Sequence, residues 1–249
     1  MTTATAAVIR SGHRTILRLE DMTSRHSFPF AGNFRLEDNA HGLLLVNNED
    51  TVDAGAGFDR HTHVETEIVT WVVSGSLVHR DSLGNTALLT PGAAQRMSAG
   101  TGVSHSEYND SWAITGERHR EPLHVVQMWI PPDEPGLTPE YQDLPLGDRL
   151  AGGGLVPVAT GMPRYVEETE GRLRNRNATL HAARPGPGTH VAIPDAPYVH
   201  VFVTRGALQA SDGTRVGPGD AVRLTGATGF TLDAVEDSEI LVWEMHAHA

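Results

Sequence analysis

Short apolar runs, broken at close intervals by turn residues, make up most of the chain. Stretches rich in valine, isoleucine, leucine and threonine are interrupted repeatedly by glycine, proline, asparagine or aspartate. Few segments show the period of an amphipathic helix, so the pattern predicts an all-β sandwich or barrel. Strands are expected over residues 15–19, 43–47, 67–73, 77–79, 87–89, 94–97, 103–108 and 123–130.

One proline-rich stretch cannot continue a central strand. Residues 131–136 read Pro-Pro-Asp-Glu-Pro-Gly, and proline has no N–H to offer to a strand ladder. We therefore predict a domain boundary here, with an N-terminal domain over 1–132 and a C-terminal domain over 133–249. Just after the boundary, Thr138 followed by Pro139 fits the cap and first position of a single helical turn.

The two halves of the chain echo each other. The run WVVSGSL at 71–77 has a counterpart in VFVTRGAL at 201–208. The turn and strand over 90–100 have a counterpart over 217–226. Because both echoes occur in the same order, they indicate a duplicated β-barrel unit.

Composition and charge exclude several classes of protein. The chain has 249 residues, of which 39% are hydrophobic, so it can bury a core. It contains no cysteine, which excludes disulfides, thiol catalysis and iron–sulfur clusters. A formal net charge of −12 argues against nucleic acid as a direct partner. We find no secretory signal and no apolar run of about 18 residues that would span a membrane, so we expect a soluble, cytoplasmic protein. A chain with two β-barrels can be a monomer, and a monomer is what we expect.

Two short pairs of metal-ligand residue types stand in the first half. His61 and His63 form one pair, and His105 and Glu107 form the other. In an extended strand, residues i and i+2 lie on the same face with Cα atoms about 6.6 Å apart. If the two strands are neighbours, three imidazoles and one carboxylate therefore converge.

This donor set favours one divalent transition metal. Imidazole suits iron, zinc, copper and nickel, and a carboxylate without a thiolate disfavours soft-metal sites. The ligands alone do not separate iron from manganese, nickel, copper or zinc. A further His-x-His pair, His246 and His248, has no second pair to complete it, and we interpret it as a frayed chain end.

These motifs resemble those of the cupin superfamily. A glycine, the paired histidines and a glutamate are similar to the first cupin motif, and Pro-Gly with a later histidine and asparagine to a stretched second motif. The residues are Gly55, His61, His63, Glu67, Pro91, Gly92, His105 and Asn109.

The chain resembles the pirin family of two-barrel cupins more specifically. The similar stretches are residues 24–32, 46–50, 67–71, 79–85 and 97–107, of which HRDSLGN and MSAGTGVSHSE are the most specific. The resemblance implies two stacked cupin-type β-barrels, with a degenerate C-terminal barrel that lacks a metal site. It also implies one metal, commonly iron, in the N-terminal barrel, and we expect Fe(II). The implied ligands are His61, His63, His105 and Glu107.

Two positions depart from the family pattern. The family usually has a proline between the paired histidines and a basic residue after them, whereas this chain has Thr62 and Val64. Strand alternation directs Thr62 away from the metal, so ligation should persist. Because the fixed φ of proline and a positive charge are missing, we expect a change in site rigidity or substrate preference.

The resemblance implies one of two functions, and Thr62 and Val64 leave open a third possibility, a duplicated β-barrel whose site has lost activity. Some bacterial pirins resemble quercetinases, which open flavonols with O2 and release carbon monoxide. In that reaction Glu107 would be the catalytic base that accepts the proton of a flavonol hydroxyl, and the alternative is that it serves only as a metal ligand. The alternative is a metal-containing regulatory protein that senses redox state and binds a protein partner without turnover.

Two further groups have open roles. Glu67 is either an additional ligand or a partner that orients a metal-bound imidazole. His79-Arg80-Asp81 adjoins a predicted hairpin turn at 82–85, and we interpret it as a charge cluster at a strand end.

Overall fold

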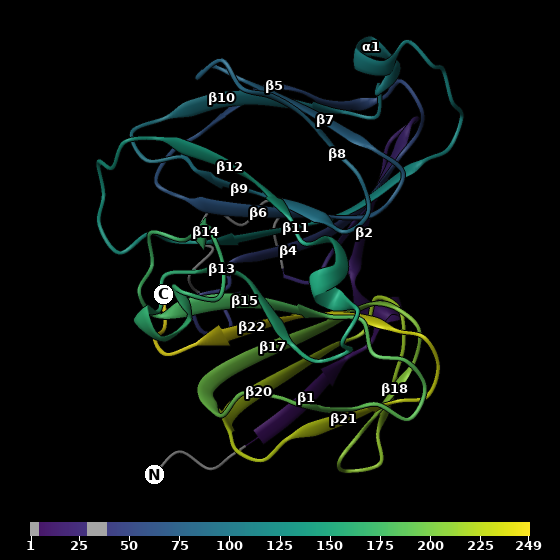
Figure 1. Ribbon diagram of the computed structural model, residues 1–249, viewed down its shortest axis with the longest axis vertical. Helices are drawn as coiled ribbons and strands as arrows, with labels where there is room; N and C mark the ends of the chain where they lie inside the picture. Colours follow the sequence, from purple (N-terminus) through teal and green to yellow (C-terminus); the bar gives the residue numbers. More distant parts are fainter. Residues whose placement is uncertain (1–4, 29–38) are drawn as a thin grey trace. The chain divides into compact units, whose positions relative to one another are not determined.

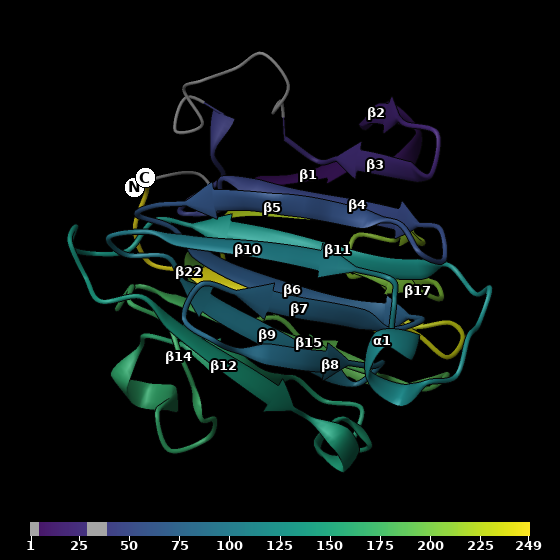
Figure 2. The ribbon, with the colours of Figure 1, turned by 90° about the horizontal axis from the view of Figure 1, so that it is seen from above.

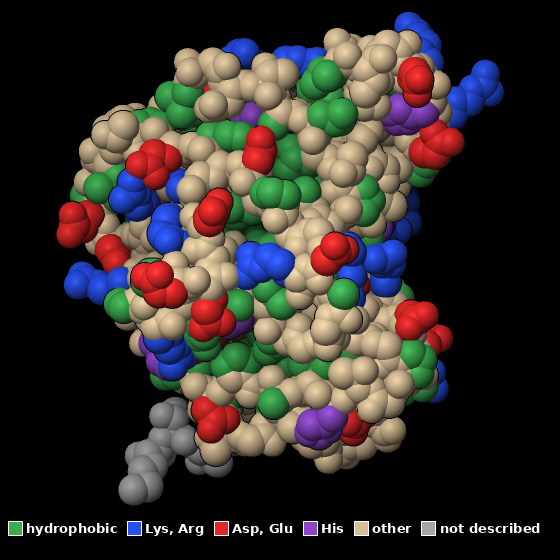
Figure 3. All heavy atoms as spheres, viewed as in Figure 1, with side chains coloured by type: hydrophobic (Ala, Val, Ile, Leu, Met, Phe, Trp, Pro, Cys, Tyr) green, Lys and Arg blue, Asp and Glu red, His purple; other side chains and the backbone are tan. Residues whose placement is uncertain are grey.

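The computed structural model describes residues 5–28 and 39–249, which form an almost all-β protein (Figure 1). Within these residues the only α-helix is the short α1 (Trp112–Thr115). No helix of this part of the chain is long and apolar enough to cross a bilayer. Residues 29–38, including the end of the 24–32 motif, lie outside the described part. On the face shown in Figure 3, acidic and basic side chains are interspersed without a broad area of one sign.

Contacts divide the chain into two compact units. The N-terminal unit contains the described residues of Thr15–Phe34 and Val46–Leu146. The C-terminal unit contains those of Met1–Arg14, Arg35–Leu45 and Gly147–Ala249.

This division differs from the boundary predicted after residue 132. The strand β12 (Glu140–Pro145) pairs antiparallel with β9 (Ala93–Ser98) and so extends the N-terminal unit. In the same way β1 (Thr5–Ile9) pairs with β20 (Ala221–Ala227) of the C-terminal unit. The helical turn predicted from Thr138 is wrong, because the β12 backbone satisfies its hydrogen bonds at the edge of a sheet instead.

Two antiparallel sheets form the N-terminal unit. They appear as separate layers in Figure 1, and Figure 2 shows their strands face-on. The seven-stranded sheet has the order β12-β9-β6-β11-β4-β3-β2, and the four-stranded sheet the order β5-β10-β7-β8. Their other bounds are β2 Thr15–Arg18, β3 Met22–His26, β4 Val46–Val52, β5 Gly57–His63, β6 Glu67–Ser74, β7 Leu77–Asp81, β8 Thr86–Leu89, β10 Val103–Tyr108 and β11 Leu123–Ile130.

The C-terminal unit has the same plan. Its seven-stranded sheet runs β1-β20-β17-β22-β15-β13-β14, and its four-stranded sheet runs β16-β21-β18-β19. The bounds are β13 Val156–Thr160, β14 Gly171–Arg172, β15 Ala178–Ala183, β16 His190–Ala192, β17 Ala196–Arg205, β18 Leu208–Ala210, β19 Arg215–Val216, β21 Thr231–Ala234 and β22 Glu239–Met245.

The sequence echoes fall at equivalent places in the two units. The first echo joins β6 to β7 in one unit and β17 to β18 in the other. The second leads into β9 and β20, which pair with β6 and β17 respectively. The repeat in the sequence is therefore a repeat of sheet order.

Apolar side chains fill the space between the sheets of each unit. In the N-terminal unit one core cluster contains Val72, Leu77 and Leu123, and another contains Met97 and Val103. Most strands predicted from apolar runs are present, with ends shifted by a few residues. The run 43–47 is the exception, because the strand β4 begins only at Val46.

Candidate metal centre

The strands β5 and β10 lie side by side, as the paired motifs require. Their register puts His61 opposite His105. A β-bulge follows, so that Glu107 pairs with Phe58, and bulges of this kind re-aim side chains next to functional sites. Gly57 allows the backbones of β5 and β10 to approach closely, because a Cβ at this position would lie 2.3 Å from the Glu107 carbonyl oxygen.

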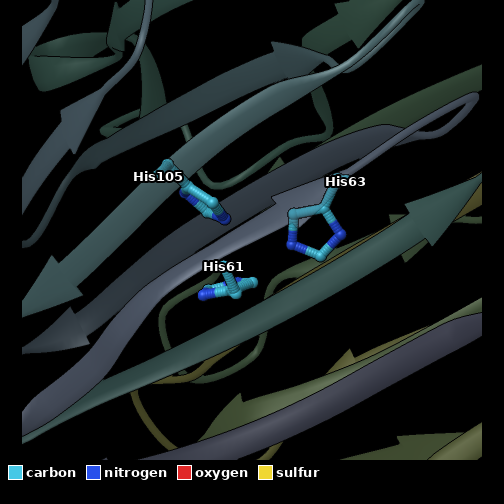
Figure 4. Close-up of side chains that lie close together, drawn as sticks. All are labelled: His61, His63 and His105. Atoms are coloured by element: carbon cyan, nitrogen blue, oxygen red, sulfur yellow. The ribbon is translucent and has the colours of Figure 1, made fainter.

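Three imidazoles from these two strands gather on one face of the sheet (Figure 4). His61, His63 and His105 each offer a ring nitrogen, and these nitrogens lie within 4.8 Å of one another. The ring centroids are 4.5 to 5.0 Å apart. His105 is fully buried, and the other two rings are half-buried.

The hydrogen bonds of these rings leave three nitrogens available to a cation. Nδ1 of His61 donates to the Asp59 carbonyl at 2.7 Å, which leaves the Nε2 lone pair free. The Nε2 atoms of His63 and His105 are buried and have no hydrogen-bond partner. Because buried polar atoms normally have a partner, this donor set fits a metal ion that binds imidazole nitrogens.

The protonation state of the buried rings also suits a metal. Burial, reinforced by the neighbouring His105 and His61, lowers the pKa of His63 to about 4. Burial, with His61 and His79 nearby, lowers the pKa of His105 to about 3. Both rings are therefore neutral near pH 7, which is the form that binds a metal.

Glu107 lies beside the three-histidine group and shares His105 with it. Its carboxylate forms a second group with His79 and His105, again with ligand atoms within 4.8 Å of one another. The Gln95 amide donates to Glu107 Oε1, and the Gln127 amide donates to Oε2 at 2.9 Å. Both carboxylate oxygens are thus held in place.

Two residues considered earlier lie away from this group. Glu67 is buried, but it accepts a hydrogen bond from Ser98 at 2.8 Å, and the next residue, Ile68, packs into the core between the sheets. Glu67 therefore faces the opposite side of β6. As strand alternation predicts, Thr62 also faces away from the rings, and its hydroxyl is 2.7 Å from that of Ser104.

The interpretation of His79 as part of a charge cluster at a strand end is wrong. The ring is fully buried and stacks on Tyr141 with centroids 4.5 Å apart. Its Nδ1 lies 3.5 Å from Nδ1 of His105. Gln95 and Gln127 were also missed. A single amide in the apolar run 125–130 was a signal that could have revealed Gln127, whereas Gln95 stands next to Arg96 and gave no such signal.

The C-terminal His-x-His pair is not the frayed end that we expected. Nε2 of His246 is 2.8 Å from the carboxylate of buried Glu244, and its backbone N–H donates to Asn177 at 2.8 Å. This histidine is therefore fixed by a carboxylate within the C-terminal unit.

A pocket of about 500 Å³ opens onto His61 and His63. Its volume falls within the range of small-molecule sites. Trp129 forms part of the wall and meets the His63 ring edge-on at 4.9 Å. The apolar lining comprises Leu17, Leu19, Met22, Phe58 and Trp129, and the polar lining includes Ser24, His26, Asn48, Asp50 and Gln127. Such a pocket suits a small molecule that combines an apolar body with polar groups.

Comparisons with known proteins agree with this architecture. The family model described as Pirin matches residues 10–130. The Mycobacterium tuberculosis protein named "Putative quercetin 2,3-dioxygenase Rv0181c" is 46% identical over 98% of this chain and 97% of its own length. A "Pirin-like protein" of Caulobacter vibrioides is 30% identical over 89% of this chain and 91% of its own.

A solved structure extends the likeness to three dimensions. The bacterial pirin YhhW from Escherichia coli, in complex with nickel(II), is 27% identical to this chain and has a TM-score of 0.83. The match covers 98% of this chain and 100% of YhhW. Together with the shared sequence along nearly the whole length, this common fold shows that the chain belongs to the pirin family.

Proposed function

We propose that this protein is a metal-dependent dioxygenase with quercetin 2,3-dioxygenase-like activity on flavonol-type substrates. The observation that carries the proposal is the convergence of three imidazoles, two of them with unpartnered Nε2 atoms, beside a largely apolar pocket. The name of the mycobacterial relative and the nickel complex of YhhW support it.

The proposed ligands are His61, His63 and His105, each through Nε2, with the Glu107 carboxylate as the fourth. Fe(II) is the ion that we propose, although manganese, nickel, copper and zinc accept the same donors. When bound, such an ion would supply Lewis acidity and a route for O2 chemistry.

Glu107 is the proposed catalytic base. Gln95 and Gln127 hold its two oxygens, so the carboxylate stays beside His105. A flavonol hydroxyl placed there would pass its proton to Glu107. Phe58 and Trp129 would pack against the flat ring system of the substrate and exclude water from the reacting atoms.

The activity can be tested with metal-free protein. The protein is loaded anaerobically with one of the five metals at a time and then mixed with quercetin and O2. We expect consumption of quercetin with release of carbon monoxide and a ring-opened product. If no metal supports product formation, the proposed activity is wrong. Stoichiometric metal without turnover would instead favour the regulatory alternative, in which capture of a protein partner depends on the metal.

The role of Glu107 has its own test. Glu107→Gln removes the base but preserves the shape of the side chain, so kcat should fall about 10²- to 10⁴-fold. Metal content is measured in parallel, because loss of a ligand also lowers activity. The matched control is Glu140→Gln, which changes a carboxylate that is more than a third exposed. A Glu107→Gln enzyme with unchanged kcat would exclude Glu107 as the base.

A further inference from the structure

We propose that Asp81 and His79 form a hydrogen-bonded relay that positions His105 and strengthens it as a metal donor. The relay lies within the four-stranded sheet of the N-terminal unit, where β7 pairs with β10. It rests on the proposed metal centre, but not on the identity of the substrate. Asp81 and His79 are positioning residues, because they act through His105.

The contacts follow one line from the carboxylate to the centre. Asp81 Oδ2 lies 3.3 Å from His79 Nε2. His79 Nδ1 lies 3.5 Å from His105 Nδ1, which is the longest contact of the relay. The remaining ring nitrogen of His105, Nε2, is the buried atom without a partner. Each of the two imidazoles therefore has one nitrogen on the side of Asp81 and one on the side of the proposed metal centre.

One arrangement of protons links these contacts in series. A carboxylate only accepts, so Nε2 of His79 carries the hydrogen that it shares with Asp81. In the tautomer that the relay requires, Nδ1 of His79 accepts the N–H on Nδ1 of His105. This leaves the lone pair of His105 on Nε2, the nitrogen that faces the other histidines. Asp81 thereby selects the tautomers of two rings in series.

Both members of the relay are firmly held. Oδ1 of Asp81 accepts the backbone N–H groups of Leu83 and Asn85, each at 2.9 Å. Oδ2 accepts the Asn85 side-chain amide at 2.7 Å. The stack on Tyr141, with an interplanar angle of 22°, fixes the plane of the His79 ring. The relay therefore imposes an orientation on His105 before any metal binds.

Glu107 is the other anion near His79. Its Oε1 lies 4.0 Å from His79 Nδ1, beyond hydrogen-bond reach, and accepts instead from the Gln95 amide. His105 is therefore the nearer partner of this nitrogen. Glu107 is held by Gln95 and Gln127, whereas His105 is held by the relay. The two arrangements are separate, although both reach the proposed centre.

A carboxylate behind a metal-bound histidine increases its basicity, and loss of such a partner costs about 10- to 100-fold in metal affinity. The stronger donor also favours Fe(III) over Fe(II), which lowers the midpoint potential of the iron. The relay would thus set both affinity and potential without touching the metal.

The C-terminal unit offers a matched control. His190 Nδ1 lies 2.6 Å from Asp233 Oδ1 on the paired strands β16 and β21. These side chains are 59% and 57% exposed, and among the described residues no metal-ligand group includes them. A change to this pair alters a histidine–aspartate contact without altering the proposed centre.

The experiment compares nickel(II) dissociation constants, measured by competition with a chelator, for the full-length protein and its variants. His79→Leu should weaken binding about 10- to 100-fold. His79→Gln keeps a donor and an acceptor and should recover part of that loss. Asp81→Asn should also weaken binding and should raise the Fe(III)/Fe(II) midpoint potential. His190→Leu should change neither quantity. Circular dichroism melting establishes that each variant is folded.

Each outcome decides between the relay and its rivals. Wild-type affinity in folded His79→Leu overturns the relay. Equal losses in folded His79→Leu and His79→Gln also overturn it, because packing against Tyr141 would then explain them. If neither His79 variant folds, the decision passes to Asp81→Asn, where an unchanged affinity and potential overturn the relay. Absence of nickel and iron binding in the wild type overturns the centre and the relay together, whereas metal binding without quercetin turnover overturns only the proposed activity.

Discussion

The two four-stranded sheets have equivalent strand orders and different interiors. In the N-terminal unit, β5 and β10 present imidazoles to the space between the sheets. In the C-terminal unit the corresponding strands β16 and β21 present Val191 and Leu232, which belong to one continuous apolar core with Leu208. Within the described residues, both groups able to hold a metal lie in the N-terminal unit.

The side chains that stabilise the fold are distinct from those of the candidate metal centre. A β-sheet tolerates many side chains on its inner face provided that they pack or find partners. The C-terminal interior is filled with aliphatic groups and gains stability from their burial. The N-terminal interior leaves two ring nitrogens unpartnered, which costs stability and marks the candidate metal centre. The two units thus share a strand order but differ in whether their interior is apolar or polar.

Removal of the His105 imidazole should have the largest effect on metal binding. His105 belongs to both possible ligand groups, so His105→Ala should lower metal affinity by more than the roughly 100-fold that follows the loss of an orienting partner. Elemental analysis of the purified variant checks this. The control is His248→Ala, which removes an exposed histidine of the C-terminal unit. Full metal content in His105→Ala would place the metal elsewhere.

A cavity in the apolar unit should affect stability and leave metal binding unchanged. Leu232 is fully buried in the C-terminal core, and Leu232→Ala should lower the free energy of unfolding by about 2–5 kcal/mol. Urea denaturation measures the loss, and chelator competition on the folded variant measures nickel affinity. If the folded variant lost nickel affinity, the functional separation between the two interiors would be refuted.

The smallest expected effect is a pH dependence that arises in the C-terminal unit. Burial, with a smaller contribution from Arg223, holds the pKa of His200 well below its usual 6.5. Below this pH the unfolded chain binds a proton that the folded ring does not, so stability falls as the pH falls. The slope from one such residue is at most about 1.4 kcal/mol per pH unit. The free energy of unfolding, measured by urea denaturation between about pH 5 and 7, should change less steeply with pH in His200→Gln than in the wild type. Equal slopes would contradict the assignment.

Strand periodicity alone predicted much of the candidate site. The i, i+2 spacing puts His61 with His63 and His105 with Glu107 on common faces, and the structure brings the three imidazoles together. It also placed Thr62 on the opposite face. Turn residues and apolar runs predicted the β class and the internal repeat. Strand alternation and turn signals are local, because each depends on residues a few positions apart, and the repeat is found by comparing two such local patterns.

Other features depend on which strands become neighbours. His79 reaches His105 only because β7 pairs with β10, and Gln127 reaches Glu107 from the opposite sheet. Likewise, β1 and β12 each join a unit on the far side of the predicted boundary. The sequence by itself determined which side chains share a strand face, since that follows from the two-residue period of the backbone. Only the tertiary structure decided what those faces meet, because strand pairing is set by packing and hydrogen bonding between distant segments.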